Sequence, residues 1–315
     1  MLSRAPVPWQ AKYLALALIW GSSFLLMKVS LHAFSAVQIA AWRLACGFVT
    51  LALLAALSPG RRVRLPRGPK VWVHLQVTAF LLGTLPFTLF ALSQTRVASA
   101  LAGVGNAITP VATVLCSLAL LRTESLPWHK VAGVVIGFGG VLMVLQPWQS
   151  AGRPDALGFG MALAGGSSYA LGWTYNRRYL AACDLGGLAQ PMAVLLLAGL
   201  QMIPVLLTWW LWIADVAAPW SLQVGPRDAV LPLAAVTALG VLGTGVAYAF
   251  QFDVVRAAGP TVGSTVTYLI PLVAISLGVL VLGESLGLAQ GVGAAVILSA
   301  AALVQRPGTR EVAGG

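Results

Sequence analysis

Long stretches without a charged residue recur along the whole chain. Eight of them contain no Asp, Glu, Lys or Arg, and two more are interrupted only by Lys28 and by Arg43. Most reach the roughly 20 residues that a helix needs to cross about 30 Å of hydrocarbon. The pattern therefore predicts ten membrane-spanning segments, near residues 12–31, 35–57, 71–92, 97–121, 131–148, 156–176, 185–213, 229–252, 257–282 and 285–305.

These segments are expected to be helices. A membrane strand would alternate apolar and polar residues, and a lipid-exposed sheet edge would leave backbone groups unpaired. The first segment follows Arg4 and Lys12, as a signal peptide would, but it is too long and has no small-x-small cleavage site before Lys28. We therefore expect an all-α integral membrane protein that keeps its first helix.

The composition agrees, because 59% of the 315 residues are hydrophobic and only 9% are charged. The net charge of +11 raises the question of nucleic acid, but the positive residues lie mainly in alternate loops, above all in residues 61–70. With both termini in the cytoplasm, only Lys28, Arg96, Arg153 and Arg227 fall outside, as the positive-inside rule requires. The basic loops are then expected to meet anionic lipid, and nucleic-acid binding is not expected.

The chain also repeats itself. The segment LLRTESLPWHKVAGVVIGFGGVLMVLQP, which ends at Pro147, resembles LVLGESLGLAQGVGAAVILSAAALVQRP, which ends at Pro307. Gly133 then matches Gly293 at a spacing of 160. This predicts two domains, residues 1–150 and 151–315, with five helices each. Five is an odd number, so the second repeat enters the membrane from the other side, and inverted repeats are typical of secondary transporters.

Several motifs resemble the EamA-type members of the drug/metabolite transporter superfamily. They are LIWGSSFLLMKVS, AAWRLACGF and ITPVATVLCSLALLRTESLPWHKVAGVVIGFGGVLMV. The resemblance implies ten helices in inverted five-helix repeats and the export of small metabolites or amino acids across a bacterial inner membrane. The second half departs from the first, since ALGWTYNRRYL replaces the Trp-Gly-Ser pattern and no arginine in GLAQPMAVLLLAG matches Arg43.

Small and polar residues share helix faces in the fourth, sixth, eighth and ninth segments. Such faces serve either helix packing or a solute pathway, and the sequence leaves both open. Buried amides and aromatic rings together suit a solute with an apolar body and a polar or zwitterionic head. The candidate pathway residues are Trp20, Ser22, Ser23, Arg43, Gln94, Asn106, Tyr169, Trp173, Asn176, Thr244, Tyr248, Gln251, Thr267 and Tyr268.

Arg43 lies near the middle of the second segment, where an unpaired charge costs on the order of 3 kcal/mol even on insertion-based scales. It must face protein or a wet cavity, and it either holds helices together or attracts a carboxylate of the substrate. Lys28 is expected to snorkel or to act as a gate. Glu124 and Glu284 are candidate gate residues as well, with helix capping as the alternative.

All eight carboxylates fall in loops or at predicted helix ends, and no phosphate-binding glycine loop is present. We therefore expect neither a proton relay nor direct use of ATP, and no metal or cofactor. A membrane enzyme acting on a lipid or isoprenoid would need clustered acids or histidines, and a non-transporting sensor or scaffold would tolerate loss of the repeat. A secondary transporter fits better than either. The substrate and the oligomeric state, with a homodimer among the alternatives, stay open.

Overall fold

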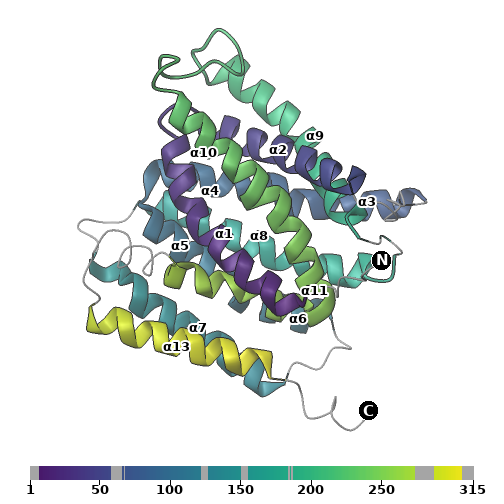
Figure 1. The fold of residues 1–315 in the computed structure, drawn as a ribbon, viewed down its shortest axis with the longest axis vertical. Coiled ribbons are helices and arrows are strands. Elements are labelled where there is room, and N and C mark those ends of the chain that lie inside the picture. Colours follow the sequence, from purple (N-terminus) through teal and green to yellow (C-terminus); the bar gives the residue numbers. More distant parts are fainter. Residues whose placement is uncertain are drawn as a thin grey trace.

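Every regular element among the described residues is a helix (Figure 1). The computed structural model describes residues 7–57, 66, 68–121, 127–149, 155–183, 185, 187–273 and 287–306. Glu124 and Glu284 lie outside the described residues. The elements are α1 (Trp9–Ser30), α2 (Ala36–Ala56), α3 (Pro69–Ala79), η1 (Phe80–Thr84), α4 (Leu85–Arg96), α5 (Ser99–Ala107), α6 (Thr109–Leu120), α7 (Trp128–Leu145), η2 (Pro147–Gln149), α8 (Ala156–Leu180), α9 (Ala189–Trp212), α10 (Val230–Gly240), η3 (Val241–Val246), α11 (Ala247–Ser264) and α13 (Leu288–Gln305).

Eight helical stretches are long and apolar enough to cross a membrane. They confirm a multi-pass, all-helical membrane protein, while the count of ten stays a prediction. The 25-residue helix α8 is long enough to cross, but its Gly, Ser, Tyr and Trp residues lower its hydropathy. The ninth expected span is helical over residues 266–273 and then continues into residues that are not described.

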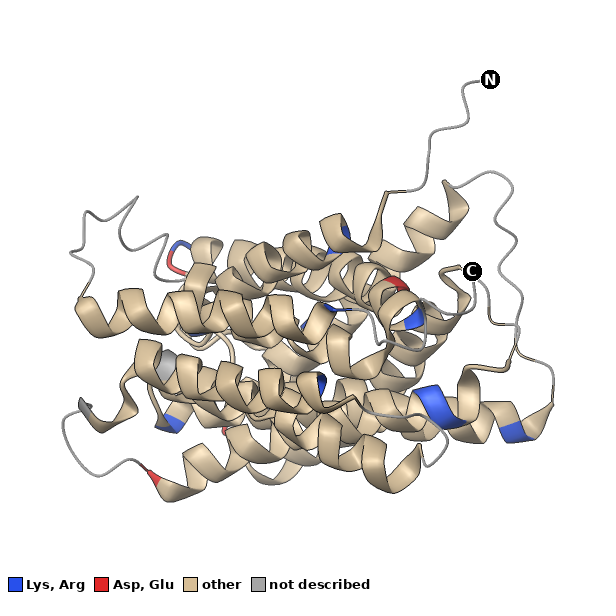
Figure 2. Cartoon of the chain, turned by 90° about the horizontal axis from the view of Figure 1, so that it is seen from below, with Lys and Arg blue, Asp and Glu red and all other residues tan. Residues whose placement is uncertain are grey.

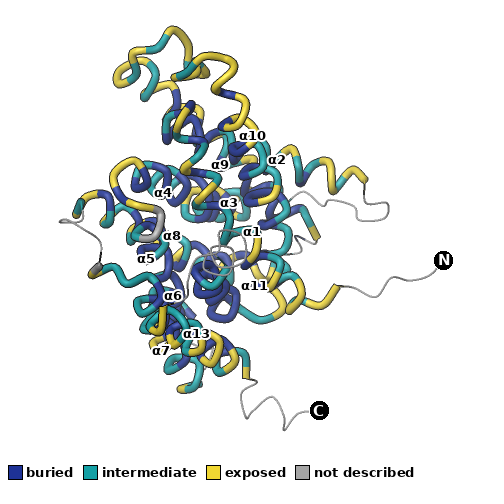
Figure 3. Tube along the Cα trace, turned by 60° about the vertical axis from the view of Figure 1, so that its left-hand side comes forward, coloured by how far each residue is buried: buried dark blue, intermediate teal, exposed yellow. Residues whose placement is uncertain are grey.

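The outer sides of the helices are apolar. On α1, Leu14, Leu18 and Leu25 are 60%, 63% and 66% exposed, a stripe that suits contact with lipid. Figure 2 shows few charged residues along the helices, and Figure 3 shows buried positions gathered where helices face one another. α1 begins near the end of α13, where Trp9 packs against the hydrophobic cluster that includes Val304. We call this side the terminal face and the other side the opposite face.

Two spans are broken near their middles. α5 ends at Ala107 and α6 begins at Thr109, and a second turn interrupts the helix at Thr265. The sequence suggests that Pro110 and Pro271 break or bend their helices, and of the two only Pro110 lies beside such a break, two residues after Ile108. Pro110 is in the first turn of α6, where the missing N–H of proline costs nothing. Pro271 lies within the helical residues 266–273.

α11 runs from the eighth expected span into the ninth through Gly259. This residue has φ 83° and ψ 168°, a conformation that glycine adopts readily because it has no Cβ. The chain can therefore reverse at Gly259 and start the next span at Pro260 without a long loop. Gly259 thus forms the junction between the two spans rather than part of a helical face.

α7 and α13 lie side by side (Figure 1) and approach closely at glycines. A Cβ built on Gly140 would lie 3.1 Å from the Gly293 carbonyl oxygen, and one built on Gly293 would lie 2.9 Å from the Gly140 oxygen. Gly133 meets the Ala300 oxygen in the same way, at 3.0 Å. At the spacing of 160, Gly133 corresponds to Gly293 and Gly140 corresponds to Ala300. The contact of Gly140 with Gly293 is therefore repeated, at the equivalent residues, by the contact of Ala300 with Gly133.

Both halves also contain a π-helix at the same place. η1 joins α3 to α4, and η3 joins α10 to α11, with the segments 161 residues apart. A π-turn shifts the backbone hydrogen bonds by one residue, and such turns are frequent at functional sites. The two π-helices therefore mark equivalent positions of the two repeats.

Candidate functional site

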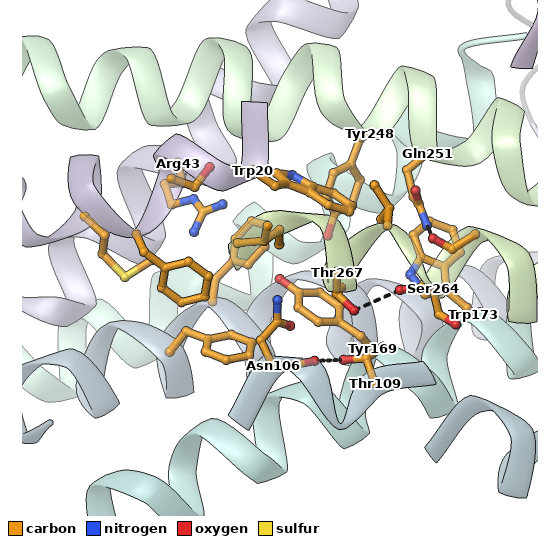
Figure 4. A pocket seen from close by; sticks show the side chains of 18 residues that line it. Trp20, Arg43, Asn106, Thr109, Tyr169, Trp173, Tyr248, Gln251, Ser264 and Thr267 are labelled. Atoms are coloured by element: carbon orange, nitrogen blue, oxygen red, sulfur yellow. Dashed lines mark hydrogen bonds between the residues drawn. The ribbon is translucent and has the colours of Figure 1, made fainter. Parts of the chain in front are cut away.

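A cavity of ≈ 70 Å³ lies between the helices of the two halves (Figure 4). Its wall is mostly aromatic and aliphatic, with a few polar groups, which is the usual composition of a site for a small organic molecule. α1, α2, α4, α5, α6, α8 and α11 contribute, as do residues 266–270. The lining residues are Trp20, Ser23, Phe24, Met27, Arg43, Phe87, Phe90, Asn106, Thr109, Tyr169, Trp173, Tyr248, Gln251, Gly263, Ser264, Val266, Thr267 and Ile270.

Arg43 is the charged group of this cavity. Its side chain is buried at 6% exposure, and its guanidinium carbon lies 4.0 Å from the ring centroid of Phe87. Nε donates to Thr244 Oγ1 at 3.2 Å, which is its only hydrogen bond within the described part of the chain. No acidic residue is among the described residues that line the cavity. The guanidinium therefore keeps donors for an anionic group.

The two π-helices supply acceptors to residues of the cavity. Trp20 Nε1 donates to the Gly243 carbonyl oxygen in η3 at 3.1 Å, and the Tyr248 hydroxyl donates to that of Leu82 in η1. Thr244 Oγ1 donates to the Leu239 oxygen five residues earlier, at 3.1 Å. Thr244 thus closes the π-turn and holds Arg43 with the same oxygen.

Two amide oxygens near the cavity are buried without a donor. Asn106 Oδ1 and Gln251 Oε1 have no hydrogen-bond partner among the described residues. The other amide atom of Gln251, Nε2, donates to the Gly263 oxygen at 3.1 Å, which fixes the orientation of this side chain. Figure 4 shows Arg43 and Gln251 at opposite ends of the group of side chains. The site therefore offers a cation at one end and unpaired acceptors elsewhere.

The cavity wall is built from equivalent positions of the two repeats. At a spacing of 161, Phe87 corresponds to Tyr248, Phe90 to Gln251, Asn106 to Thr267 and Thr109 to Ile270, and all eight line the cavity. Sequence reasoning missed Phe24, Phe87 and Phe90, although two signals were present. One is this spacing. The other is the Gly-Ser-Ser of residues 21–23, repeated at 166–168, which makes Phe24 correspond to Tyr169.

Arg43 interrupts this correspondence. Gln38 in the first turn of α2 matches Gln190 in the first turn of α9, and the same spacing places Leu195 opposite Arg43. Equivalent positions of both repeats therefore form the cavity wall, but its charged residue comes from the first repeat alone. This agrees with the absence of a second arginine noted in the sequence.

Lys28 and Gln94 lie in a pocket of ≈ 830 Å³ on the opposite face, which we call the outer vestibule. The end of α1, the start of α2, α4 and the end of α9 form it. Asn176 lies in a pocket of ≈ 280 Å³ on the terminal face, the terminal pocket, where its Oδ1 accepts from Gln190 Nε2 at 2.6 Å. Two predicted pathway residues, Gln94 and Asn176, therefore lie outside the central cavity.

The terminal pocket is separated from the cavity by aromatic rings and is bordered by an ion-pair network. Trp173, which lines the cavity, packs edge-on against Phe252 of the pocket, with ring centroids 4.9 Å apart. Beside them, Asp253 pairs with Lys12 of α1 and, at 3.2 Å, with Arg256. These contacts join α1, α8 and α11 and close the cavity toward the terminal face.

Three further predicted residues lie beside the cavity or away from it. Ser22 donates to the Ile19 carbonyl oxygen of its own helix at 2.8 Å and does not line the cavity. Thr244 does not line the cavity but accepts a hydrogen bond from Arg43, which does. The Tyr268 hydroxyl donates to the Val134 oxygen of α7 at 2.9 Å, so this ring packs between helices. By contrast, Trp20, Ser23, Arg43, Asn106, Tyr169, Trp173, Tyr248, Gln251 and Thr267 all line the cavity.

A membrane protein of helical repeats, with a small mixed polar and apolar cavity between them, has the architecture of a secondary transporter. The chain belongs to the EamA-like transporter family, whose model matches residues 9–146 and 156–306. It is therefore a multi-pass membrane transporter.

Two relatives are also named as transporters, and one solved structure has a similar fold. The chain is 26% identical over 310 residues to the uncharacterized inner membrane transporter YedA of Escherichia coli, covering 96% of this chain and 92% of YedA. It is 29% identical over 140 residues to an uncharacterized transporter of Archaeoglobus fulgidus, which covers 43% of this chain and 48% of that protein. A protein of known crystal structure shares the fold, with a TM-score of 0.71, 19% identity and coverage of 94% and 96% of the two chains.

Proposed function

We propose that this transporter exports small carboxylate-bearing metabolites, amino acids among them, by alternating access through the central cavity. The observation that carries the proposal is the combination of the Arg43 guanidinium with the unpaired oxygens of Asn106 and Gln251 in one aromatic-walled cavity. A carboxylate complements the guanidinium, and the ammonium group of a zwitterion can donate to the amide oxygens. The rings of Phe87, Tyr169 and Trp173 suit an apolar body.

Inverted repeats would let each half rock against the other and open the cavity to one face at a time. The reciprocal glycine contacts and the paired π-helices support such a two-fold relationship. The distribution of Lys and Arg supports placing both termini, and hence the terminal face, in the cytoplasm.

No acid among the described residues lines the cavity, and this supports transport without a tightly coupled proton. The partners in this proposal are a small-molecule substrate and the surrounding lipid, with no nucleic acid and no cofactor. Export rather than import follows the resemblance to the family.

The test is counterflow in proteoliposomes containing the purified protein. Amino acids and their carboxamides form matched solute pairs that differ in the carboxylate. Arg43→Gln should reduce uptake of the carboxylates at least about tenfold, since a hydrogen bond to a charged group contributes roughly 1.5–3 kcal/mol. Arg96→Gln is the control, because Arg96 pairs with Asp155 away from the cavity, at 3.0 Å. Equal transport of acids and carboxamides by both wild type and Arg43→Gln would refute the proposal.

A further inference from the structure

The outer vestibule is separated from the central cavity by two aromatic rings. Phe24 of α1 and Phe90 of α4 both line the cavity and pack edge to face, with centroids 6.1 Å apart. Lys28 follows Phe24 by four residues and Gln94 follows Phe90 by four. Each therefore stands about one helical turn further toward the opposite face. Lys28 and Gln94 form the next layer along the same route.

Lys28 bridges α1 and α4 in this layer. Its Nζ donates to the backbone oxygen of Gln94 at 3.2 Å. Lys28 is the only charged residue among the described residues that line the vestibule, and none of the described carboxylates pairs with it. An ammonium group has three donors, and this contact uses one. The vestibule therefore carries a positive charge that a ligand can balance.

The side chain of Gln94 is unpaired. It is fully buried at 0% exposure, and neither Oε1 nor Nε2 has a hydrogen-bond partner among the described residues. A buried amide without partners is costly, and a leucine would fill the same place without that cost. The presence of glutamine at position 94 is explained if its amide has a hydrogen-bond partner at another step of the transport cycle.

The remaining wall suits the body of an organic solute. Leu31, Phe34 and Leu92 line the vestibule from the first half, and Val205 and Trp209 line it from α9. At ≈ 830 Å³ the vestibule is within the range of small-molecule sites, about 300–1,000 Å³. It can thus hold a solute whose acidic end is on Lys28 and whose apolar end is on these side chains.

The corresponding positions of the second half are apolar. The Gly-Ser-Ser match places Trp173 at the position of Lys28, and the spacing of 161 places Val255 at that of Gln94. On the terminal face, therefore, a ring and an aliphatic side chain stand where the opposite face has a cation and an amide. The pair formed by Lys28 and Gln94 is thus not repeated at the equivalent positions of the second half, although the terminal pocket has polar residues of its own, Asn176, Gln190 and Arg256.

We infer that Lys28 and Gln94 form a second substrate site, an exit site that binds the carboxylate of the solute after it leaves the central cavity. The Lys28 ammonium group pairs with the carboxylate, and Gln94 Nε2 donates to it. This inference rests on the proposed function, since it takes the same class of solute. It adds a stage of release at a pair of residues that the equivalent positions of the second half do not form.

The probe for this site is p-benzoyl-L-phenylalanine, which has a free carboxylate and a photoreactive apolar body. It is cross-linked to the purified protein in phosphatidylcholine nanodiscs, and labelled peptides are located by mass spectrometry. Label on residues 92–95 of α4 or on the end of α9 reports the vestibule, and label on α8 or α11 reports the central cavity. The variants are Lys28→Gln and Gln94→Leu, with Arg96→Gln as the control on the same helix.

Vestibule labelling should fall at least about fivefold in Lys28→Gln and Gln94→Leu and stay unchanged in Arg96→Gln, because loss of a charge partner weakens carboxylate binding. Central labelling should be unchanged in all three. The carboxamide of the probe should not label the vestibule above background. Gln94→Leu removes an unpaired buried amide, so its thermal stability should equal or exceed that of wild type, which separates lost binding from misfolding.

Vestibule labelling that persists in Lys28→Gln, or that is equal for the carboxamide, would overturn the exit site. So would loss of labelling in wild type when phosphatidylglycerol replaces phosphatidylcholine, because a lipid headgroup would then be the occupant. Central labelling without Lys28-dependent vestibule labelling would reject the exit site alone. Lys28-dependent labelling without any central labelling would reject the proposed function alone, and no labelling at either place would reject both.

Discussion

Phe87 and Tyr248 pack edge to face in the wall of the central cavity, with ring centroids 6.0 Å apart and an angle of 74° between the rings. They occupy equivalent positions of the two repeats, each in the first turn after a π-helix. Phe87 lies against the Arg43 guanidinium, and Tyr248 has the hydroxyl that donates to Leu82. The repeats thus formed the same wall and diverged in what each ring contacts.

Arg43→Lys should transport carboxylate-bearing solutes less well than wild type but better than Arg43→Gln. Lysine keeps the positive charge and loses both the planar set of donors and the stacking on Phe87. Carboxamides of the same solutes should pass equally through all three proteins. Counterflow rates in proteoliposomes check this order. A lysine variant no better than the glutamine variant would show that charge alone does not serve the substrate.

Thr244→Val should lower the affinity for carboxylate-bearing solutes by about 2- to 13-fold without unfolding the protein. The change removes the hydroxyl that accepts from Arg43 Nε, and a typical hydrogen bond contributes about 0.5–1.5 kcal/mol. Thr113→Val is the matched control, because that buried hydroxyl donates only to Thr109 of its own helix and does not line the cavity. Concentration dependence of uptake is the measurement. Equal affinities for the two variants would contradict the role of Thr244.

Gly140→Ala should destabilise the protein, while Gly139→Ala should not. The new methyl group at position 140 would meet Ile297 at 2.9 Å and the Gly293 oxygen at 3.1 Å, whereas nothing lies within 4 Å of one at position 139. Alanine also favours helix over glycine by about 0.5–1 kcal/mol, so the second change should be neutral or stabilising. Thermal unfolding in detergent, followed by size-exclusion chromatography, compares the two. The same unfolding temperature for both variants would argue against tight packing of α7 on α13.

Asp253→Asn should open the terminal pocket more often. The carboxylate joins Lys12 of α1 to α11, and a partly exposed pair of this kind contributes about 0.2–1 kcal/mol. Cys183 lines the pocket and can report its accessibility after Cys46 and Cys116 are replaced by Ala. Maleimide should then label Cys183 up to about fivefold faster in Asp253→Asn.

The control for this experiment is Asp155→Asn, which breaks a similar ion pair with Arg96 at the start of α8, at the other end of that helix from the pocket. It should leave the labelling rate unchanged. An increase of the same size in both variants would indicate general loosening rather than a contact that closes the terminal face.

Membrane orientation can be tested with two exposed arginines. In a background without native cysteines, Arg227→Cys should react with an impermeant thiol reagent added to intact cells, and Arg306→Cys should react only after permeabilisation. The first residue lies between α9 and α10 on the opposite face, and the second directly follows α13 on the terminal face. The reverse result would place both termini outside the cell and contradict the proposed orientation.

The sequence predicted the apolar helices because the need to exclude charge from lipid acts on every residue of a span. It also placed Asn106, Tyr169, Trp173 and Gln251 on the pathway, because polar and amphipathic groups are rare inside a membrane unless they have a role. All four line the cavity. Phe87 was not predicted, since an apolar ring in such a helix looks the same whether it faces lipid or solute.

Tyr268 illustrates a different limit. It was assigned to the pathway as an amphipathic ring that can donate a hydrogen bond, but its hydroxyl donates to Val134 of α7. An amphipathic ring serves helix packing as well as a pathway wall, and the sequence does not separate the two roles. The correspondence between the halves is more reliable here, because it pairs Asn106 with Thr267 regardless of the turn at Thr265.

The contact between α7 and α13 is self-complementary, since Gly140 meets Gly293 and the equivalent residues Ala300 and Gly133 meet in the same way. A surface that fits its own two-fold image does not require a partner of different sequence. One five-helix unit, inserted into the membrane in both orientations, could therefore assemble with its own copy through this contact. Gene duplication and fusion would then have preserved a dimer that already existed and freed each half to change on its own, as the unmatched arginine at position 43 illustrates.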